Sequence, residues 1–375
     1  MKWRRRPRPL VSVVVPVYDV EAYLPHCLES LLAQDRGELD IVVVDDGSTD
    51  RSGAIADRYA AEEPRIRVVH TDNHGLGAAR NEGLRHVRGD YVGFADSDDV
   101  VPPTAYGTML AALERSGSDF VTGSIVWWRG ADLTEPPWMR RLHTPARSGA
   151  TAAEHPEILG DVFAWNKLFR RSFWDAAGLS WPEGIRYEDQ PTTTRAYLAG
   201  RFDVLPAVVY HWRIRDDGSS ITQQRASVAD LADRFETKRM ALASVEASPD
   251  AAAVRPHFLD RVLAGDLHRY FLLIPGCSDE WWALLESGVR ELWGERSLVH
   301  SGLPPVHRLT GWLVEQGRRA DAATVMAYVA GLDGAPAPRV RADGGGVRID
   351  VPGIDPATVD PAALAVRDHE VGGSR

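Results

Sequence analysis

The chain has 375 residues, of which 44% are hydrophobic and 26% are charged, and its formal net charge is -10. This composition is typical of a folded globular protein and excludes general disorder, and the length favours two or three domains. The acidic balance argues against nucleic acid as a partner, because the recognition of phosphates needs a basic surface.

Several features bear on the location of the protein. No apolar run reaches the roughly 18 residues that a membrane span needs, and no secretory signal is visible. The two cysteines, Cys27 and Cys277, fit no disulfide or metal spacing, which favours a reducing compartment. We therefore expect a cytoplasmic protein. Residues 1–9 include five basic side chains, so this segment is either a solvated tail or a peripheral contact with anionic lipid on the inner face of the membrane.

Strand-like and helix-like patterns alternate from Leu10 onward. Between the strand-like runs, the spacing of Leu24, Leu28 and Leu31 places apolar side chains on one helical face, and helical patterns also follow the second and third runs. This alternation predicts a parallel α/β sheet, in which ligands bind beyond the carboxyl ends of the strands. The strand-like runs are 11–15, 41–44, 66–69 and 91–95, and the polar segments expected at the shared edge are 16–19, 45–50, 70–73 and 96–99.

The fourth strand-like run leads directly into Asp96, Asp98 and Asp99. Carboxylates this close repel one another unless they are solvated, hydrogen-bonded or bound to a cation. Mg²⁺ and Mn²⁺ take such oxygen ligands, usually one or two carboxylates together with substrate phosphates. The alternative is an Asp-rich turn in which Asp99 caps the helix that follows.

Two other segments at this edge have the chemistry of a nucleotide site. Asp45 and Asp46 can accept hydrogen bonds from a nucleobase, although an Asx turn with a helix cap explains them equally. Gly75 and Gly77 open a glycine-rich helix start whose Arg80 suits an anionic phosphate. Arg80 stands where a dinucleotide fingerprint has its third glycine, so that fingerprint is excluded.

Four motifs together resemble the family 2 glycosyltransferases in order and spacing: VVVPVY (13–18), VDDGSTD (44–50), GLGAARN (75–81) and DSDD (96–99). The resemblance covers roughly residues 10–125. It implies a GT-A fold, an α/β architecture with a mostly parallel sheet flanked by helices. It also implies a donor that is a UDP-sugar or another nucleoside-diphosphate sugar, and Mn²⁺ or Mg²⁺ as the cofactor.

By this resemblance, each motif has a role on the donor side. Asp98 would bind the cation that bridges the diphosphate and neutralises the leaving group. The residues expected to bind the nucleotide are Pro16 and Tyr18 beside the uracil, Asp45 or Asp46 paired with it, Arg80 near the nucleotide and Asp96 near the ribose.

Glu188 and Asp189 supply an acidic pair like the one that related enzymes carry on the acceptor side. We predict that Asp189 is the general base, which takes the proton of the acceptor hydroxyl, and that Glu188 orients or tunes it. The alternative is an acidic pair at a helix N-terminus, where the helix dipole favours negative charge.

Further residues of the second half are assigned by the same resemblance. Trp165, Asn166 and Lys167 match a segment that lines the acceptor side, although Lys167 could equally be a surface ion-pair partner. His211 would be a further metal or diphosphate contact and Arg213 a phosphate contact. The alternative for His211 is a structural role, which is common for a lone histidine at a strand end.

The remaining chain sets the expected domain boundaries. Residues 135–148 are rich in Pro and Arg and have the composition of a surface loop. The helical pattern after about residue 226 indicates a second domain, whose tryptophans could also form a homo-oligomer interface. We expect a basic tail (1–9), a GT-A domain (10–225) with donor (10–125) and acceptor (126–225) halves, a mainly helical domain (226–333) and a linker-like tail with one short strand (334–375).

The sequence therefore predicts an inverting, metal-dependent transferase of hexosyl or N-acetylhexosaminyl groups. Its acceptor would be a hydroxyl of a cell-surface polymer, such as teichoic acid (a polyol-phosphate) or capsular or extracellular polysaccharide, or the lipid-linked precursor of such a polymer. The alternative is a non-catalytic module that binds nucleotide-sugar or serves as a scaffold, which would lack the base. A phospho-receiver domain would need a phospho-accepting Asp and a switch Lys, and neither is recognisable.

Overall fold

The computed structural model describes residues 10–35, 38–215, 227–342 and 345–371. These residues divide into two compact units. The first contains the described residues up to 215 together with 240–251, and the second contains 227–239 and 252–371. The basic N-terminal segment, and with it the predicted membrane contact, lies outside the described residues.

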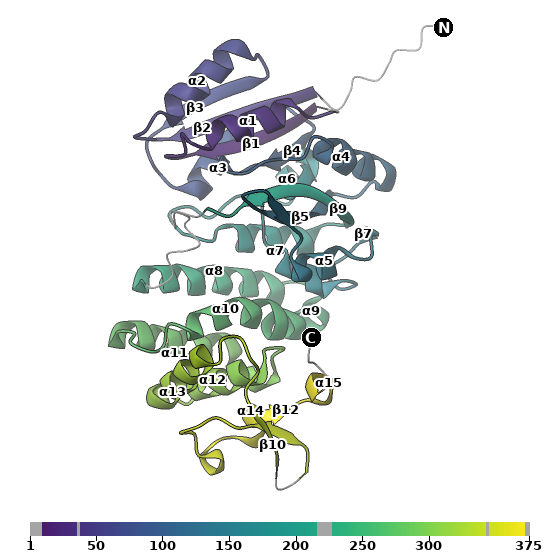
Figure 1. Cartoon of the computed structure of the whole chain (residues 1–375). Coiled ribbons are helices and arrows are strands. Elements are labelled where there is room, and N and C mark those ends of the chain that lie inside the picture. The colour runs from purple at the N-terminus through teal and green to yellow at the C-terminus, as the bar shows by residue number, and fades with distance from the viewer. Residues whose placement is uncertain (1–9, 36–37, 216–226, 343–344, 372–375) are drawn as a thin grey trace. The chain divides into compact units, whose positions relative to one another are not determined.

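The first unit is built on a sheet with the strand order β3-β2-β1-β4-β8-β5-β9-β7 (Figure 1). The first four strands in this order are parallel, and Val15 of β1 pairs with Val43 of β2 in the register. The β-branched side chains of β1 and β2 are buried on both faces, as expected of strands covered by crossover helices. The bounds are β1 Leu10–Val17, β2 Glu38–Asp46, β3 Ile66–Thr71 and β4 Tyr91–Phe94.

The other half of the sheet is mixed in direction. Strand β8 lies between β4 and β5 and is antiparallel to both, whereas β9 runs parallel to β5. The prediction of an α/β sheet flanked by helices is confirmed, but its mostly parallel character holds for the donor half alone. The bounds are β5 Phe120–Arg129, β6 Asp132–Thr134, β7 Arg147–Ala150, β8 Lys167–Arg170 and β9 Phe202–Arg213.

The helices of this unit bury the faces that their apolar spacing predicts. Leu24, Leu28 and Leu31 of α1 are fully buried. The segment 135–148, however, was wrongly predicted as a surface loop, because it contains α5 with Met139 and His143 fully buried. The helices are α1 Leu24–Leu32, α2 Ser52–Glu62, α3 Leu76–His86, α4 Ala105–Ser116, α5 Pro137–His143, α6 Arg171–Ala176 and α7 Asp189–Ala199.

The second unit is mainly helical, and α8 (Val228–Glu246) contributes residues to both units. Its other main helices are α9 Ala251–His257, α10 Ala264–Phe271, α11 Asp279–Trp293, α12 Pro305–Glu315 and α13 Arg319–Gly331. No helix among the described residues is both long and apolar enough to cross a membrane.

The C-terminal residues expected to be linker-like contain a small sheet of three strands instead. Arg308 of α12 is fully buried and donates to the carboxylate of Glu370 and, at 2.6 Å, to the carbonyl oxygen of Ala365. These bonds attach the end of the chain to the helices. The strands are β10 Arg339–Arg341, β11 Val347–Ile349 and β12 Ala365–Val366.

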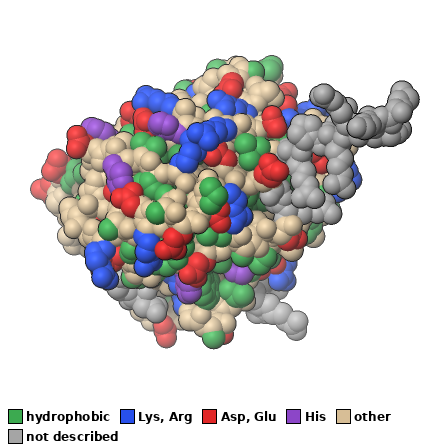
Figure 2. Space-filling view, turned by 90° about the horizontal axis from the view of Figure 1, so that it is seen from above, with side chains coloured by type: hydrophobic (Ala, Val, Ile, Leu, Met, Phe, Trp, Pro, Cys, Tyr) green, Lys and Arg blue, Asp and Glu red, His purple; other side chains and the backbone are tan. Residues whose placement is uncertain are grey.

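Figure 2 shows the face at the top of Figure 1. Basic and acidic side chains are interspersed over the described part of this face, and they do not form a continuous basic patch there. A nucleic acid would need such a patch for its phosphates.

The packing of α3 on the sheet gives the first prediction. A Cβ atom on Gly83 would lie 2.3 Å from Cγ1 of Val14 and 3.2 Å from Cγ2 of Val44. We expect Gly83→Ala to lower the free energy of unfolding by about 1–3 kcal/mol, because the closely packed helix must move away from the strands. Urea denaturation measures this change. Gly265→Ala in α10 is the control, because its Cβ would meet no atom within 4 Å, and an equal loss in both variants would contradict the packing argument.

Candidate active site

Arg80 of α3 joins the two halves of the first unit. Its guanidinium is fully buried, donates from Nη1 to Oε1 of Glu188 at 2.6 Å and to the carboxylate of Asp189, and donates from Nη2 to Oδ1 of Asp96 at 2.8 Å. Asp96 follows β4 in the donor half, whereas Glu188 and Asp189 begin α7 in the acceptor half. Three carboxylates from two distant segments of the chain therefore bind one guanidinium.

The position of Arg80 depends on a close approach between α3 and the segment before α7. A Cβ atom on Gly77 would lie 1.9 Å from the carbonyl oxygen of Pro182, so glycine is the residue that fits there. The guanidinium of Arg80 also lies over the ring of Trp181, 5.1 Å from its centroid. The glycine-rich motif thus brings a helix against the acceptor half, a role that differs from the phosphate site predicted from sequence.

Burial raises the pKa of two of the carboxylates around Arg80, and the acidic pair differs in access to solvent. Burial raises the pKa of Glu188, the neighbouring Asp189 raises it further, and Arg80 opposes the change. Burial likewise raises the pKa of Asp96 to about 6 against the effect of Arg80. The side chain of Glu188 is 5% exposed and that of Asp189 is 19% exposed. Asp189 is therefore the more accessible member of the acidic pair, and both residues also stand at a helix start, as the alternative interpretation expected.

Asp45 and Asp46, at the end of β2, hold the loops beside them. Asp46 accepts hydrogen bonds from the backbone N–H groups of His74 at 3.0 Å and Gly75 at 2.9 Å. Asp45 accepts from the N–H of Ser48 at 3.1 Å and contacts Nδ1 of His70 at 2.8 Å. Both carboxylates are buried. Their pairing with a nucleobase stays a prediction, and their observed role is to fix the loops of a site.

The end of β1 contains one residue that the sequence analysis missed. Pro16 is buried and Tyr18 is 47% exposed. Asp19 has a positive φ of 48° and accepts a hydrogen bond from the N–H of Thr49 at 2.7 Å. Because Asp is one of the few residues that tolerate this backbone conformation, an Asp two residues after the end of β1 was the available signal.

The predicted metal ligand Asp98 is paired with Arg215. Nε and Nη2 of Arg215 both approach Oδ2 of Asp98, at 2.8 and 2.7 Å. Arg213 donates from Nε to the carbonyl oxygen of Asp98 at 2.7 Å and from its backbone N–H to Oδ1 of Asp99 at 2.7 Å. Its guanidinium also lies 3.9 Å from the ring centroid of Trp128. The end of β9 is thereby attached to the acidic loop after β4.

His211 contributes to the same attachment through its backbone. Its N–H donates to the carbonyl oxygen of Val100 at 2.9 Å, and burial lowers the pKa of its half-buried imidazole. Among the described residues, no group of three or more His, Cys, Asp or Glu side chains could hold a metal by itself. The oxygen ligands at this site still suit Mn²⁺ or Mg²⁺. Both contacts of Arg215 are to Oδ2 of Asp98, so Oδ1 can bind a cation, and a diphosphate supplies further oxygens.

The structure buries Trp165, Asn166 and Lys167 instead of exposing them to an acceptor. Trp165 stacks on Tyr210 with ring centroids 4.1 Å apart, and the side chains of Asn166 and Lys167 are fully buried. Lys167 contacts Oδ1 of Asp161 at 3.0 Å. Lys167 is therefore neither a direct acceptor contact nor a surface ion-pair partner, because its ammonium group pairs with Asp161 in the interior.

Comparison with known proteins agrees with this architecture. The model of "Glycosyl transferase family 2" matches residues 12–176. The glycosyltransferase GlyG of Streptococcus pneumoniae is 40% identical over 240 residues, which are 61% of this chain and 79% of GlyG. The chain belongs to the family 2 glycosyltransferases. The uncharacterized glycosyltransferase EpsJ of Bacillus subtilis is 35% identical over 228 residues, 57% of this chain, and the match spans 63% of the length of EpsJ.

This family 2 chain also has the fold of a solved relative. The poly(ribitol-phosphate) beta-N-acetylglucosaminyltransferase TarS of Staphylococcus aureus is 27% identical over 265 residues, which are 69% of this chain and 44% of TarS. The crystal structure of TarS residues 1–349 in complex with UDP-GlcNAc superposes with a TM-score of 0.70 and 23% identity. The superposition covers 92% of this chain and 98% of that structure, so the GT-A fold expected from sequence is confirmed.

The raised pKa of Glu188 predicts a pH-dependent effect on stability. The folded protein binds this proton more tightly than the unfolded chain, so stability is lost as the pH rises above the ordinary value of 4.5. Glu188→Gln imitates the protonated side chain and removes this loss. We expect the variant to gain stability relative to the wild type between pH 5 and pH 8, measured by urea denaturation at both values. A difference that does not change with pH would contradict the raised pKa.

Proposed function

We propose that this chain is an inverting glycosyltransferase that moves a sugar from a UDP-sugar, or another nucleoside-diphosphate sugar, to a hydroxyl group of a polymer. One observation carries the proposal. Arg80 holds Asp96, beyond β4, and Asp189, at the start of α7, on the same guanidinium. The donor edge of the sheet and a partly exposed carboxylate therefore share one site, as a displacement between two bound substrates requires.

Asp189 is the proposed general base. Its carboxylate takes the proton of the acceptor hydroxyl while that oxygen attacks the anomeric carbon from the face opposite the diphosphate, so the configuration inverts. Arg80 holds Oδ1, and the N–H of Ala164 lies 3.4 Å from Oδ2. Glu188, whose raised pKa favours its protonated form, competes less with Asp189 for Arg80 and thereby tunes the base.

The donor side is assigned to the loops beyond β1, β2 and β4. Asp98 would hold Mn²⁺ or Mg²⁺, with His211 and Arg213 on the diphosphate side, and the bound cation would neutralise charge that develops on the leaving diphosphate. Arg215 contacts Oδ2 of the same carboxylate, so Oδ1 of Asp98 is the oxygen assigned to the cation. The residues assigned to the nucleotide are Pro16, Tyr18, Asp45, Asp46 and Asp96.

The proposed acceptor is a cell-surface polymer, either a polyol-phosphate chain such as teichoic acid or a capsular or extracellular polysaccharide, or its lipid-linked precursor. Support comes from the printed function of TarS, which acts on poly(ribitol-phosphate), together with the shared fold. A panel of nucleotide sugars with such polymers, assayed for released nucleoside diphosphate, identifies the donor and acceptor. Absence of release with every donor in the panel would contradict the proposal.

The role of Asp189 predicts a selective loss. Asp189→Asn keeps the shape of the side chain but cannot accept the proton, so we expect transfer to fall about 10²–10⁴-fold while the donor still binds. Steady-state transfer and titration with UDP measure the two effects separately. Asp175→Asn is the matched control, because Asp175 is a largely exposed carboxylate in the same unit. Full transfer by the Asp189 variant would refute its assignment.

The role of Asp98 predicts a different loss. Asp98→Asn removes the charge of the proposed cation ligand, so we expect UDP affinity in the presence of Mn²⁺ to fall about tenfold or more. Isothermal titration of UDP with and without Mn²⁺ checks this expectation. The affinity measured without the cation should change much less. Equal affinities for the two proteins in Mn²⁺ would show that Asp98 does not hold the cation.

A further inference from the structure

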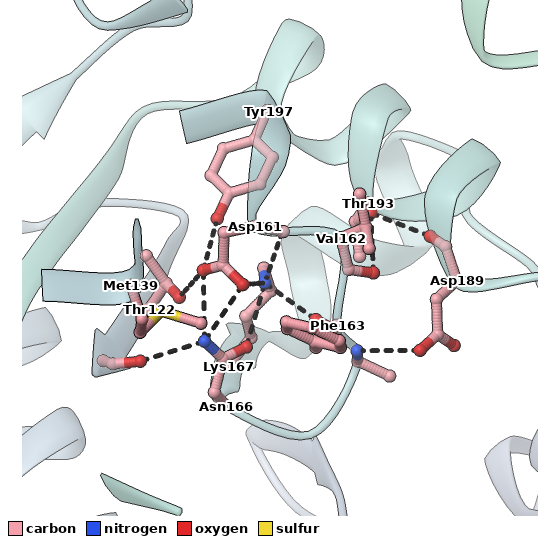
Figure 3. Close-up of polar contacts among 12 residues, drawn as sticks. Thr122, Met139, Asp161, Val162, Phe163, Asn166, Lys167, Asp189, Thr193 and Tyr197 are labelled. Carbon is pink, nitrogen blue, oxygen red and sulfur yellow. Dashed lines mark hydrogen bonds and ion pairs between the residues drawn. The ribbon is translucent and has the colours of Figure 1, made fainter. Parts of the chain in front are cut away.

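A buried ion pair lies beside the proposed base, in the acceptor half (Figure 3). Asp161 and Lys167 are both fully buried, and Nζ lies 3.0 Å from Oδ1. Oδ2 of Asp161 accepts hydrogen bonds from the hydroxyl groups of Thr122 at 2.5 Å and Tyr197 at 3.1 Å. The carboxylate is thereby fixed to β5 and α7 at the same time.

Lys167 organises the loop that precedes it. Besides the ion pair, Nζ donates to the carbonyl oxygens of Asp161 at 2.9 Å and Phe163 at 2.7 Å and to Oδ1 of Asn166 at 3.0 Å. Inward-pointing carbonyl groups are costly in a buried loop unless a donor satisfies them. The ammonium therefore holds residues 161–166 in one conformation.

This loop contacts Asp189 and the first turn of α7 (Figure 3). The N–H of Ala164 lies 3.4 Å from Oδ2 of Asp189. The hydroxyl of Thr193 lies 3.2 Å from the carbonyl oxygen of Val162 and 2.8 Å from that of Asp189. The loop thus contacts the base at Oδ2, whereas Arg80 holds Oδ1.

The charges of this pair are maintained by their mutual attraction. Burial by itself raises the pKa of Asp161, but Lys167 and His143 outweigh it, so the pKa lies well below its usual range. Burial lowers the pKa of Lys167, and Asp161 opposes this effect. Apolar residues of similar size often replace such pairs without loss of stability. A stability role alone therefore gives little reason for an ion pair at this position.

We propose that Asp161 and Lys167 are positioning residues that set the orientation of Asp189 through the loop 161–166. This inference rests on the proposed role of Asp189 as the base. A general base acts within hydrogen-bond reach of the acceptor hydroxyl, and a displacement of about 1 Å can cost about 100-fold in rate. Loosening the loop should lower the rate of transfer and leave the donor loops beyond β1, β2 and β4 unchanged.

The main test is the double variant Asp161→Asn/Lys167→Met. It removes both charges together and keeps the side chains close to their original size, so no lone charge is left in the interior. We expect kcat for transfer to fall about 100-fold. The KM for the donor and the affinity for UDP in Mn²⁺ should stay within about twofold, as expected when only the orientation of the base changes.

The second unit offers a matched control. Lys238 is also fully buried, and its Nζ lies 2.6 Å from Oδ2 of Asp266. Asp266→Asn/Lys238→Met removes a partly buried ion pair, in which Asp266 also contacts Arg234 at 3.0 Å, from a unit that contains none of the proposed site residues. We expect kcat of this variant to match the wild type, with thermal unfolding measured for both. An equal fall of kcat in both double variants would assign the loss to general destabilisation and overturn the proposal.

A milder variant keeps the proposal testable if the first double variant does not fold. Thr193→Val removes the hydroxyl between the loop and α7 but retains the ion pair, and we expect a smaller fall in kcat with an unchanged donor KM. Unchanged kcat in Thr193→Val, or in the folded Asp161/Lys167 variant, overturns the positioning role. The proposed function is tested separately, because loss of transfer in Asp189→Asn would still support it. Full activity of Asp189→Asn overturns both.

Discussion

The site depends on one buried guanidinium among three carboxylates. Coulomb interactions are strong where water is excluded, so Asp96, Glu188 and Asp189 would repel one another without Arg80. Burial raises the pKa of Glu188, and the neighbouring Asp189 raises it further, because a single cation cannot balance three ionised carboxylates. Asp189 is the more accessible acid of the pair. Arg80 thus connects the geometry of the site with the protonation of its members.

The loops at the ends of β1 and β2 are organised by hydrogen bonds within the chain. Asp19, Asp45 and Asp46 use their carboxylates to hold the loops at the ends of β1 and β2. Loops fixed in this way lose little conformational freedom when a nucleotide binds. On the acceptor side, the buried Asp161–Lys167 pair holds the loop 161–166, which contacts the start of α7. Asp189 contacts the donor half through Arg80 and the loop 161–166 through Ala164.

Much of the fold and part of the site could be predicted from local sequence. Continuous β-branched runs mark β1 and β2 because strands covered on both faces need apolar side chains at successive positions. The spacing of Leu24, Leu28 and Leu31 marks α1 for the corresponding reason. Asp96 and Asp98 were recognisable as candidates because they follow a strand end, whereas Glu188 and Asp189 were recognisable through the resemblance to related enzymes.

The partners of these residues were decided by tertiary structure, because a pairing between distant segments leaves no periodic pattern in the chain. The antiparallel strand β8 enters between β4 and β5, and this insertion brings Lys167 to Asp161 and removes both from solvent. Arg80 was expected to face a phosphate, but the close approach that Gly77 permits turns it toward three carboxylates. The sequence by itself determined which residues could carry the chemistry. The packing of the two halves of the sheet decided which of them line the proposed site and which hold the others in place.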